Sequence, residues 1–403
     1  MATFLLIIIY FAFISLGLPD SLLGATWPIM QPDFGVPYSF AGIASMVISG
    51  GTIISSLLSG RVINRFGTGK VTFVSVLMTA VALLGFSLAP SFPWIVVLAI
   101  PLGLGAGAVD SGLNEYVAEH YKSHHMSWLH CFWGIGAMSG PLIMSQMIAL
   151  DHSWRSGYLI VSIIQWVLVV ILFFSIPIWK QGSSLSLSVQ SDGSVSENPA
   201  AIESPPGFFS PLKIRGVKYV LMAFFFYCGI EATMGLWGGS YLVRARGLDP
   251  VTAAEWVSLF YASITFGRLV TGFVTMRLSN PILIRAGTII IICGIVLLFL
   301  PLPALAALIA FVLIGLGCAP IFPIMLHETP GRFGKQSAQQ VMSFQMAVAY
   351  VGSTFLPPLF GFVASNASLS LLPVFVIVYG GALLASSELV NLAVGWKKGT
   401  SPG

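Results

Sequence analysis

The chain has 403 residues, of which 56% are hydrophobic and only 8% are charged. Soluble globular proteins carry about 25% charged residues, so this composition excludes a soluble enzyme or binding module and predicts an integral membrane protein. The net charge of +4 does not indicate a nucleic-acid partner, because the basic residues follow the loops on one side of the predicted membrane.

Apolar runs of about twenty residues recur along the chain and predict membrane-spanning helices, since a barrel would show shorter alternating segments. We expect twelve spans, at residues 3–30, 37–60, 71–89, 94–119, 127–149, 155–179, 217–243, 251–273, 282–300, 303–326, 337–364 and 370–393. Between the sixth and seventh lies a stretch rich in Ser and Pro, which is typical of a flexible linker. The prediction is an all-α membrane protein with a six-helix bundle at 1–180, a cytoplasmic linker at 181–215 and a second six-helix bundle at 216–403.

The basic residues predict the orientation. With both termini in the cytoplasm, fifteen of the 18 Lys and Arg residues, Arg268 among them, fall on the inner side. The three left outside are Arg155, Arg244 and Arg246. Cytoplasmic loops carry such an excess of positive charge. We therefore expect a multi-pass protein of the cell membrane, inner or plasma, with both termini cytoplasmic.

Short motifs recur at equivalent places in the two halves. Gly60 precedes Arg65 by five residues after the second span, and Gly272 precedes Arg277 by five after the eighth. The segment GLGAGAVDS in the fourth span aligns with GLGCAPIFP in the tenth. Parallel repeats of this kind are found in many secondary transporters.

The twelve spans, the 6+6 division and the segment GRVINRFG at residues 60–67 resemble the major facilitator superfamily. Its signature between spans two and three is G-x-x-x-D-R-x-G, and Asn64 stands here at the acidic position. The resemblance implies the fold of that superfamily and a role in conformational change for the signature residues and their second-half counterparts. These are Gly60, Arg61, Asn64, Arg65, Gly67, Gly272 and Arg277.

Three further segments narrow the resemblance. They are DSGLN at 110–114, WLHCFWGIGAMSGP at 128–141 and YCGIE at 227–231. These segments are similar to the fucose:proton symporter family and the related sodium-dependent glucose transporters. The resemblance implies that Asp110 matches the acidic position of the fourth span that exchanges the proton in fucose symporters, and that Asp20 matches a first-span acid.

Three carboxylates, Asp20, Asp110 and Glu231, lie well within predicted spans. A charge inside a lipid-embedded bundle is costly, so each is a candidate functional group. The alternative is a structural carboxylate hydrogen-bonded to a neighbouring helix. Asp110 and Asn114 are four residues apart and share one helical face. We predict that the three carboxylates couple transport to a cation, with H⁺ favoured over Na⁺.

Sugar recognition requires hydrogen-bonding side chains and aromatic platforms for the ring. The predicted substrate-binding residues are Asn114, His130, Trp133, Gln345, Trp27, Trp237 and Tyr227. Two alternatives stay open, because a lone histidine is commonly a satisfied core residue and tryptophans favour the membrane boundary.

Neither a phosphate-binding loop nor a nucleophile elbow is present, which argues against an ATP-driven pump and against an enzyme. The histidines between spans four and five have no Cys or carboxylate at ligand spacing, and the four cysteines show no paired spacing. We expect no metal site and no cofactor besides the coupling ion.

The leading hypothesis is a secondary active transporter that moves a monosaccharide or a related small polar solute with a cation by alternating access. The alternative is a proton-coupled drug or solute efflux antiporter, because GAMSGP at 136–141 is similar to the fifth-span motif of such proteins. A third class is a sensor or lipid scramblase on the same scaffold. The expected partners are a sugar-like small molecule and the lipid bilayer, with no nucleic acid and with a monomer as the working unit.

Overall fold

The computed structural model describes residues 2–121, 123–150, 153–189 and 210–395. Every regular element in these ranges is a helix. Eleven of the described segments are long and apolar enough to cross a membrane. The helix α6, Ser123–Ala149, lies between the fourth and fifth of them and completes the twelve predicted spans. The all-α membrane fold expected from the sequence is therefore confirmed.

The first six spans are formed by α1 to α7. Their bounds are α1 Ala2–Asp20, α2 Leu22–Phe34, α3 Phe40–Phe66, α4 Thr68–Leu88, α5 Phe92–His120, α6 Ser123–Ala149 and α7 Trp154–Val189. The helix α7 continues into the stretch predicted as a linker, which therefore begins as helix. Residues 190–209 of that stretch lie outside the described residues.

The last six spans are formed by α8 to α15. Their bounds are α8 Val217–Arg246, α9 Pro250–Val274, α10 Asn280–Phe299, α11 Ala304–Cys318, α12 Ile321–His327, α14 Lys335–Asn366 and α15 Leu372–Val394. The short helix α13, Thr329–Phe333, and the 3-10 turns at Ser210–Lys213 and Leu369–Leu371 complete the order.

Two spans are broken near their middle. The first divides into α1 and α2 at Ser21, two residues after Pro19, and the tenth divides into α11 and α12 at Ala319 and Pro320. Proline removes a backbone donor and crowds the preceding turn, which interrupts a helix. Interrupted helices are tolerated at membrane depth only where protein or a water-filled cavity surrounds the freed backbone groups. The first break follows Asp20 directly.

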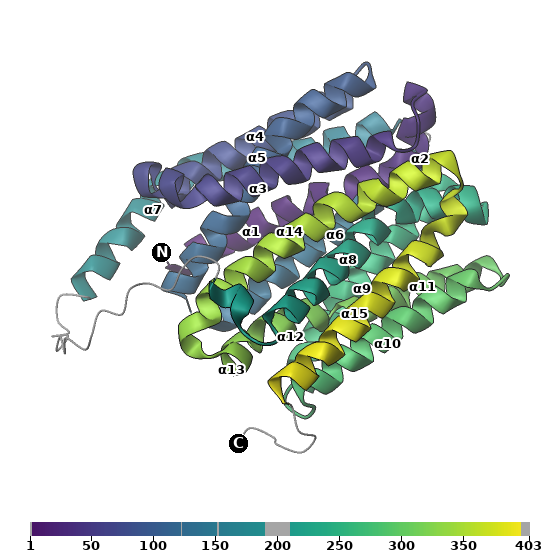
Figure 1. Cartoon of the computed structure of the whole chain (residues 1–403). Helices are drawn as coiled ribbons and strands as arrows, with labels where there is room; N and C mark the ends of the chain where they lie inside the picture. The colour runs from purple at the N-terminus through teal and green to yellow at the C-terminus, as the bar shows by residue number, and fades with distance from the viewer. Residues whose placement is uncertain (1, 122, 151–152, 190–209, 396–403) are drawn as a thin grey trace.

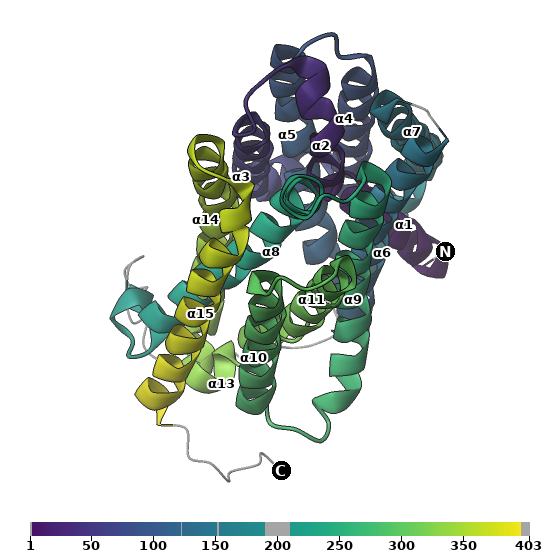
Figure 2. The ribbon, with the colours of Figure 1, turned by 90° about the vertical axis from the view of Figure 1, so that its right-hand side faces the viewer.

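Each half packs mainly against itself, and three helix pairs make most of the contacts between the halves. These pairs are α2 with α8, α3 with α14 and α6 with α9, whose helices lie side by side in Figure 2. The start of α1 and the end of α15 lie at the same end of the bundle (Figure 1). That end is called the terminal end below, and the opposite end, which carries the 35–39 turn, is called the far end.

From the middle of the spans to the far end, the two halves are in direct contact. A Cβ on Gly24 of α2 would lie 2.0 Å from the Gly235 carbonyl oxygen of α8, so the two backbones touch. The backbone N–H of Ser39 donates to Ser365 Oγ at 2.8 Å. The Arg244 guanidinium carbon lies 5.4 Å from the Tyr38 ring centroid. These contacts close the passage between the halves at the far end.

Inside the first half, glycines let α1 and α6 approach at backbone distance. A Cβ on Gly136 would lie 2.1 Å from the Ile14 carbonyl oxygen, and one on Gly17 would lie 2.1 Å from the Trp133 carbonyl oxygen. Small residues allow such packing between membrane helices, which lack a hydrophobic driving force against lipid. The close approach places Trp133 beside the end of α1.

The start of α9 is set by a side-chain cap. Asp249 Oδ1 accepts the Thr252 backbone N–H at 2.9 Å, and Pro250 occupies the first helical position. This hydrogen bonding holds the pKa of the Asp249 carboxyl below its ordinary value. The cap fixes where α9 begins, and so the height at which its one basic residue, Arg268, lies in the bundle.

Gly136→Ala should lower the free energy of unfolding by about 1–3 kcal/mol, because an added methyl group would overlap the backbone of α1. The measurement is the thermal unfolding midpoint of the purified protein in detergent. Gly50→Ala is the matched control, since a Cβ at Gly50 of α3 meets no atom within 4 Å. Equal midpoints for the two variants would contradict close packing of α1 on α6.

Candidate functional site

Asp20 and Trp133 meet at the break in the first span. Trp133 Nε1 on α6 donates to Asp20 Oδ2 at 2.8 Å. Asp20 is exposed although it lies in the middle of a span, so water reaches this carboxylate. Because the halves close the far end, the access that remains along the bundle axis is from the terminal end.

A second carboxylate, Glu231, is connected to Trp133 through Arg268. The Arg268 guanidinium carbon on α9 lies 5.6 Å from the ring centroid, which is within cation–π range. Arg268 Nη2 lies 3.8 Å from Glu231 Oε2 on α8, and that oxygen accepts the Tyr227 hydroxyl at 2.5 Å. The five residues Asp20, Trp133, Arg268, Glu231 and Tyr227, from four helices of both halves, are called the central cluster below.

Arg268 is the member of this cluster that the sequence analysis missed. It was counted with the inner-side basic residues, although it lies within the predicted span 251–273. The structure places it on α9 with its side chain 15% exposed. The available signal was the rarity of an arginine inside a span, which has the same cost as an acidic residue there.

Asp110 forms a separate group with Asn114 and Tyr350. Asn114 Nδ2 donates to Asp110 Oδ1 at 2.9 Å, as expected for two residues on one face of α5. The Tyr350 hydroxyl on α14 donates to Asp110 Oδ2 at 3.2 Å. This hydrogen bond joins the two halves. The sequence contains no pattern that pairs Tyr350 with Asp110, because the contact depends on how α5 and α14 face each other.

Four residues predicted to bind substrate lie outside both groups. Trp27 and Trp237 are fully buried, and their indole N–H groups donate to the Tyr38 and Pro357 carbonyl oxygens at 3.1 and 2.7 Å. Gln345 is fully buried, and its Oε1 accepts the Thr329 hydroxyl at 2.9 Å. His130 packs edge-on against Phe13 with 6.1 Å between ring centroids. The structure does not bring these four side chains to the carboxylates.

The residues predicted to act in conformational change lie at the terminal ends of α3 and α9. Arg61, Asn64, Arg65 and Arg277 are exposed, and the Arg65 guanidinium carbon lies 5.5 Å from the Phe66 ring centroid. Gly67 separates α3 from α4 with a φ of +83°, a conformation that favours glycine. A Cβ on Gly60 or Gly272 would meet no atom within 4 Å.

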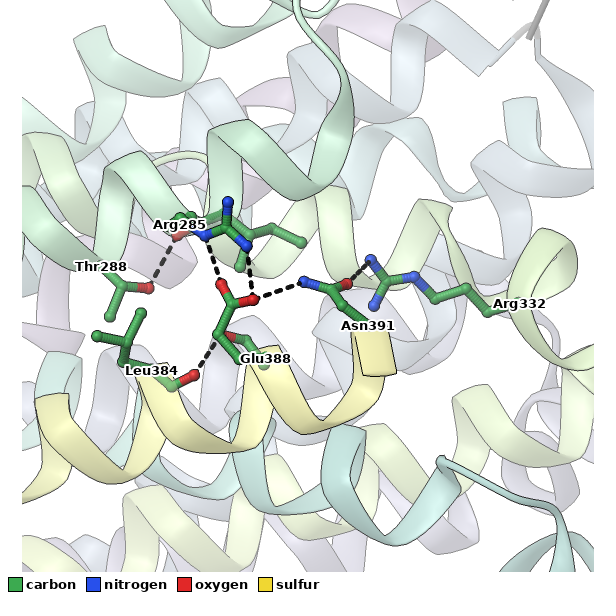
Figure 3. A network of polar contacts seen from close by, with 8 residues as sticks. Arg285, Thr288, Arg332, Leu384, Glu388 and Asn391 are labelled. Atoms are coloured by element: carbon green, nitrogen blue, oxygen red, sulfur yellow. Dashed lines mark hydrogen bonds and ion pairs between the residues drawn. The ribbon is translucent and has the colours of Figure 1, made fainter. Parts of the chain in front are cut away.

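A polar network to which the sequence analysis assigned no role joins α10, α13 and α15 (Figure 3). Arg285 Nε and Nη2 donate to the two oxygens of Glu388, both at 2.6 Å. Arg332 Nη2 donates to Asn391 Oδ1 at 3.2 Å, and Arg332 Nε donates to Glu328 Oε2 at 2.6 Å. The bidentate Arg285–Glu388 pair satisfies both charges, which marks the network as a support of the second half.

Other features of the described residues lie away from the carboxylates. A cavity of about 430 Å³ opens between the start of α8 and the end of α15, lined by Arg215, Tyr219 and Leu392 among others. It contains no predicted site residue. Within the ranges that the structure describes, no three His, Cys, Asp or Glu side chains converge as metal ligands would.

Comparison with known proteins gives the family. The sequence profile of the Major Facilitator Superfamily matches residues 9–357. The chain belongs to the major facilitator superfamily. Proteins of this superfamily are transporters rather than enzymes, so the family implies a small-molecule substrate and a lipid environment.

Individual members of the superfamily are similar to this chain at low identity. Bypass of stop codon protein 6 of Saccharomyces cerevisiae is 25% identical over 66% of this chain, and the match spans 56% of the yeast protein. The glucose/mannose transporter GlcP of Bacillus subtilis is 24% identical, and the match covers 79% of this chain and 77% of GlcP. The crystal structure of a D-xylose-proton symporter superposes with a TM-score of 0.73 and 13% identity, over 96% of both chains.

Tyr350→Phe should lower the free energy of unfolding by about 1–3 kcal/mol, because Asp110 Oδ2 loses its donor from the other half. The measurement is thermal or denaturant unfolding in detergent. Tyr379→Phe is the matched control, since the buried Tyr379 hydroxyl has no hydrogen-bond partner and its removal should be neutral or stabilising. If Tyr379→Phe destabilises as much as Tyr350→Phe, the contact between Tyr350 and Asp110 does not hold the halves together.

Proposed function

We propose that this chain is a secondary active transporter that moves a monosaccharide, or a related small polar solute, together with H⁺ by alternating access. The observation that carries the proposal is the central cluster. Its ionisable side chains come from both halves, lie at mid-span and can be reached by water. Costly ionisable groups at the interface of two repeats are the usual composition of a coupled transport site.

The surroundings of the carboxylates support H⁺ as the coupling ion. A bound Na⁺ requires several oxygen acceptors that point at one place. Here each carboxylate faces donors instead: Trp133 Nε1 at Asp20, the Tyr227 hydroxyl at Glu231, and the Asn114 amide with the Tyr350 hydroxyl at Asp110. Donors stabilise a carboxylate and leave no oxygen cage around it, which suits a group that gains and loses a proton.

The aromatic and polar side chains at the site support a sugar-like solute. Trp133 is only partly buried and lies between Asp20 and Arg268. An indole ring with hydrogen-bonding groups at its rim suits the apolar face and the hydroxyls of a sugar ring. The glucose/mannose transporter GlcP and the D-xylose-proton symporter, to which the chain is similar, also support this substrate class.

The proposed orientation has the terminal end in the cytoplasm of a cell or inner membrane. The excess of Lys and Arg on that side supports it. The far end is then the outer end, and its contacts close the outer entrance while water reaches Asp20 from inside. With this orientation, the proposal assigns the structure to an inward-facing state. One chain holds both halves, so a monomer suffices for the mechanism.

The structure of the segment GAMSGP at 136–141 does not favour the efflux alternative. Gly136 and Gly140 of the segment GAMSGP lie against the backbone carbonyl oxygens of Ile14 and Leu18. Close packing of α6 on α1 accounts for both glycines without reference to the direction of transport. A specific observation for export is therefore lacking, and symport stays the proposal.

Asp110→Asn should abolish accumulation of substrate and retain exchange, because an amide binds like a neutral carboxyl but cannot release a proton. The measurement is uptake of radiolabelled sugars into proteoliposomes under an imposed pH gradient, with a Na⁺ gradient in a parallel set. Glu255→Gln on α9 is the control, since this partly buried carboxylate belongs to neither group. Accumulation by Asp110→Asn would exclude Asp110 from the carboxylates that couple transport to the proton.

A further inference from the structure

We propose that Arg268 binds a carboxylate of the substrate and that Glu231 occupies Arg268 when the substrate is absent. The transported solute is then a carboxylated polar molecule such as a sugar acid. This inference rests on the proposed function and specifies its substrate class. It begins from the guanidinium of Arg268, the basic member of the central cluster.

Part of the hydrogen-bonding capacity of Arg268 is not used within the protein. Its Nε is buried without a hydrogen-bond partner. Its Nη2 lies 3.8 Å from Glu231 Oε2, which is an ion pair but beyond hydrogen-bond distance. A guanidinium held in a span normally makes short, charge-assisted hydrogen bonds, because an unpaired buried donor is expensive. The pair Arg285–Glu388, at 2.6 Å on both arms, shows the geometry that this chain achieves where the bridge is structural.

The shape and the net charge of the cluster select the ligand. The planar fork of a guanidinium matches the two oxygens of a carboxylate or a phosphate. The central cluster already holds two negative charges, Asp20 and Glu231, and one positive charge, Arg268, so it would not neutralise a dianion. A single carboxylate is the anion that this site can neutralise, and the partly buried ring of Trp133 lies next to it for the body of the ligand.

The exchange of partners conserves charge. When Glu231 takes up a proton from the water that reaches the site, it loses its negative charge and its attraction to Arg268. The carboxylate of the substrate then replaces it, so the charge around the guanidinium is the same before and after. Tyr227 remains as a partner for the protonated carboxyl. Binding of the anion is thereby linked to uptake of one proton at Glu231.

Other ionisable side chains act electrostatically on this pair, and a change of pH reaches them too. They are Asp20 of α1, His130 and Cys131 of α6, Tyr227 and Cys228 of α8, Tyr261 of α9 and Cys318 of α11. The substitution of Glu231 itself therefore has to separate its contribution from theirs.

The first experiment compares matched neutral and acidic sugars in proteoliposomes with an alkaline interior. The probes are glucose, xylose and galactose against glucuronate, galacturonate and gluconate. We expect the acids to accumulate and the neutral sugars to be excluded. Accumulation of neutral sugars, alone or equally with the acids, overturns the inference and leaves the proposed function standing. Uptake of none of the six overturns both.

The second experiment measures binding by the stabilisation of purified protein against heat with increasing glucuronate or whichever acid is transported. Arg268→Gln should weaken binding by at least about thirtyfold, the loss expected when a buried charged partner is removed. Arg268→Lys keeps the positive charge but lacks the planar guanidinium, so its affinity should lie between that of the unchanged protein and that of Arg268→Gln. It also provides the measurement if Arg268→Gln does not fold. Arg215→Gln, an exposed position before α8, should bind like the unchanged protein. Unaltered binding by Arg268→Gln or Arg268→Lys would overturn the inference.

The third experiment follows binding between about pH 5 and 8, where the carboxyl group of the probe stays ionised. In the unchanged protein binding should weaken as the pH rises, because binding of the anion is accompanied by uptake of a proton. Glu231→Gln should bind more tightly at the upper end of the range and lose most of the pH dependence. If Glu231→Gln binds more weakly, or keeps the full pH dependence, Glu231 is not the competing group.

Discussion

The arrangement of this bundle depends on the cost of an ionisable side chain in an apolar environment. Each carboxylate at mid-span has a donor from another helix or from the next turn of its own. Two of these contacts cross helices, Trp133 to Asp20 and Tyr350 to Asp110, and the second of them joins the halves. The carboxylates, whose burial costs free energy, therefore also hold together, through their hydrogen bonds, the helices that form the site.

The apolar packing around the site leaves little freedom for gradual adjustment. Glycines bring α1 against α6 and α2 against α8 at backbone distance, where any translation along the axis drives a carbonyl group into a neighbouring turn. Packed interfaces of this kind have discrete arrangements rather than a continuous range. Movement of one half relative to the other therefore has to separate whole helix pairs, as alternating access requires.

The fold was predictable because its signal is local: twenty apolar residues in a row span a bilayer wherever they occur. The carboxylates were predictable for the same reason. The hydrogen-bond partners of the carboxylates could not be predicted. Tyr350 and Asp110 are 240 residues apart in sequence, and their contact depends on how their two helices face each other. Residue type also failed to separate Trp133 at the site from Trp27 and Trp237 in the core, since an indole suits both environments. Arg268 could have been predicted as a site residue, because it lies inside a predicted span, but it was counted only among the basic residues of the inner side.

The break in the first span divides one chain segment between two neighbours. The helix α1 packs on α6 of its own half, and α2 packs on α8 of the other half. Ser21 between them is fixed to α6, because its hydroxyl donates to the Ala137 carbonyl oxygen at 2.6 Å. In the proposed alternating-access mechanism α2 leaves α8 when the far end opens, and the change in angle is then concentrated at one joint. Asp20 is the residue at that joint, so the opening of the gate and the environment of the carboxylate change together.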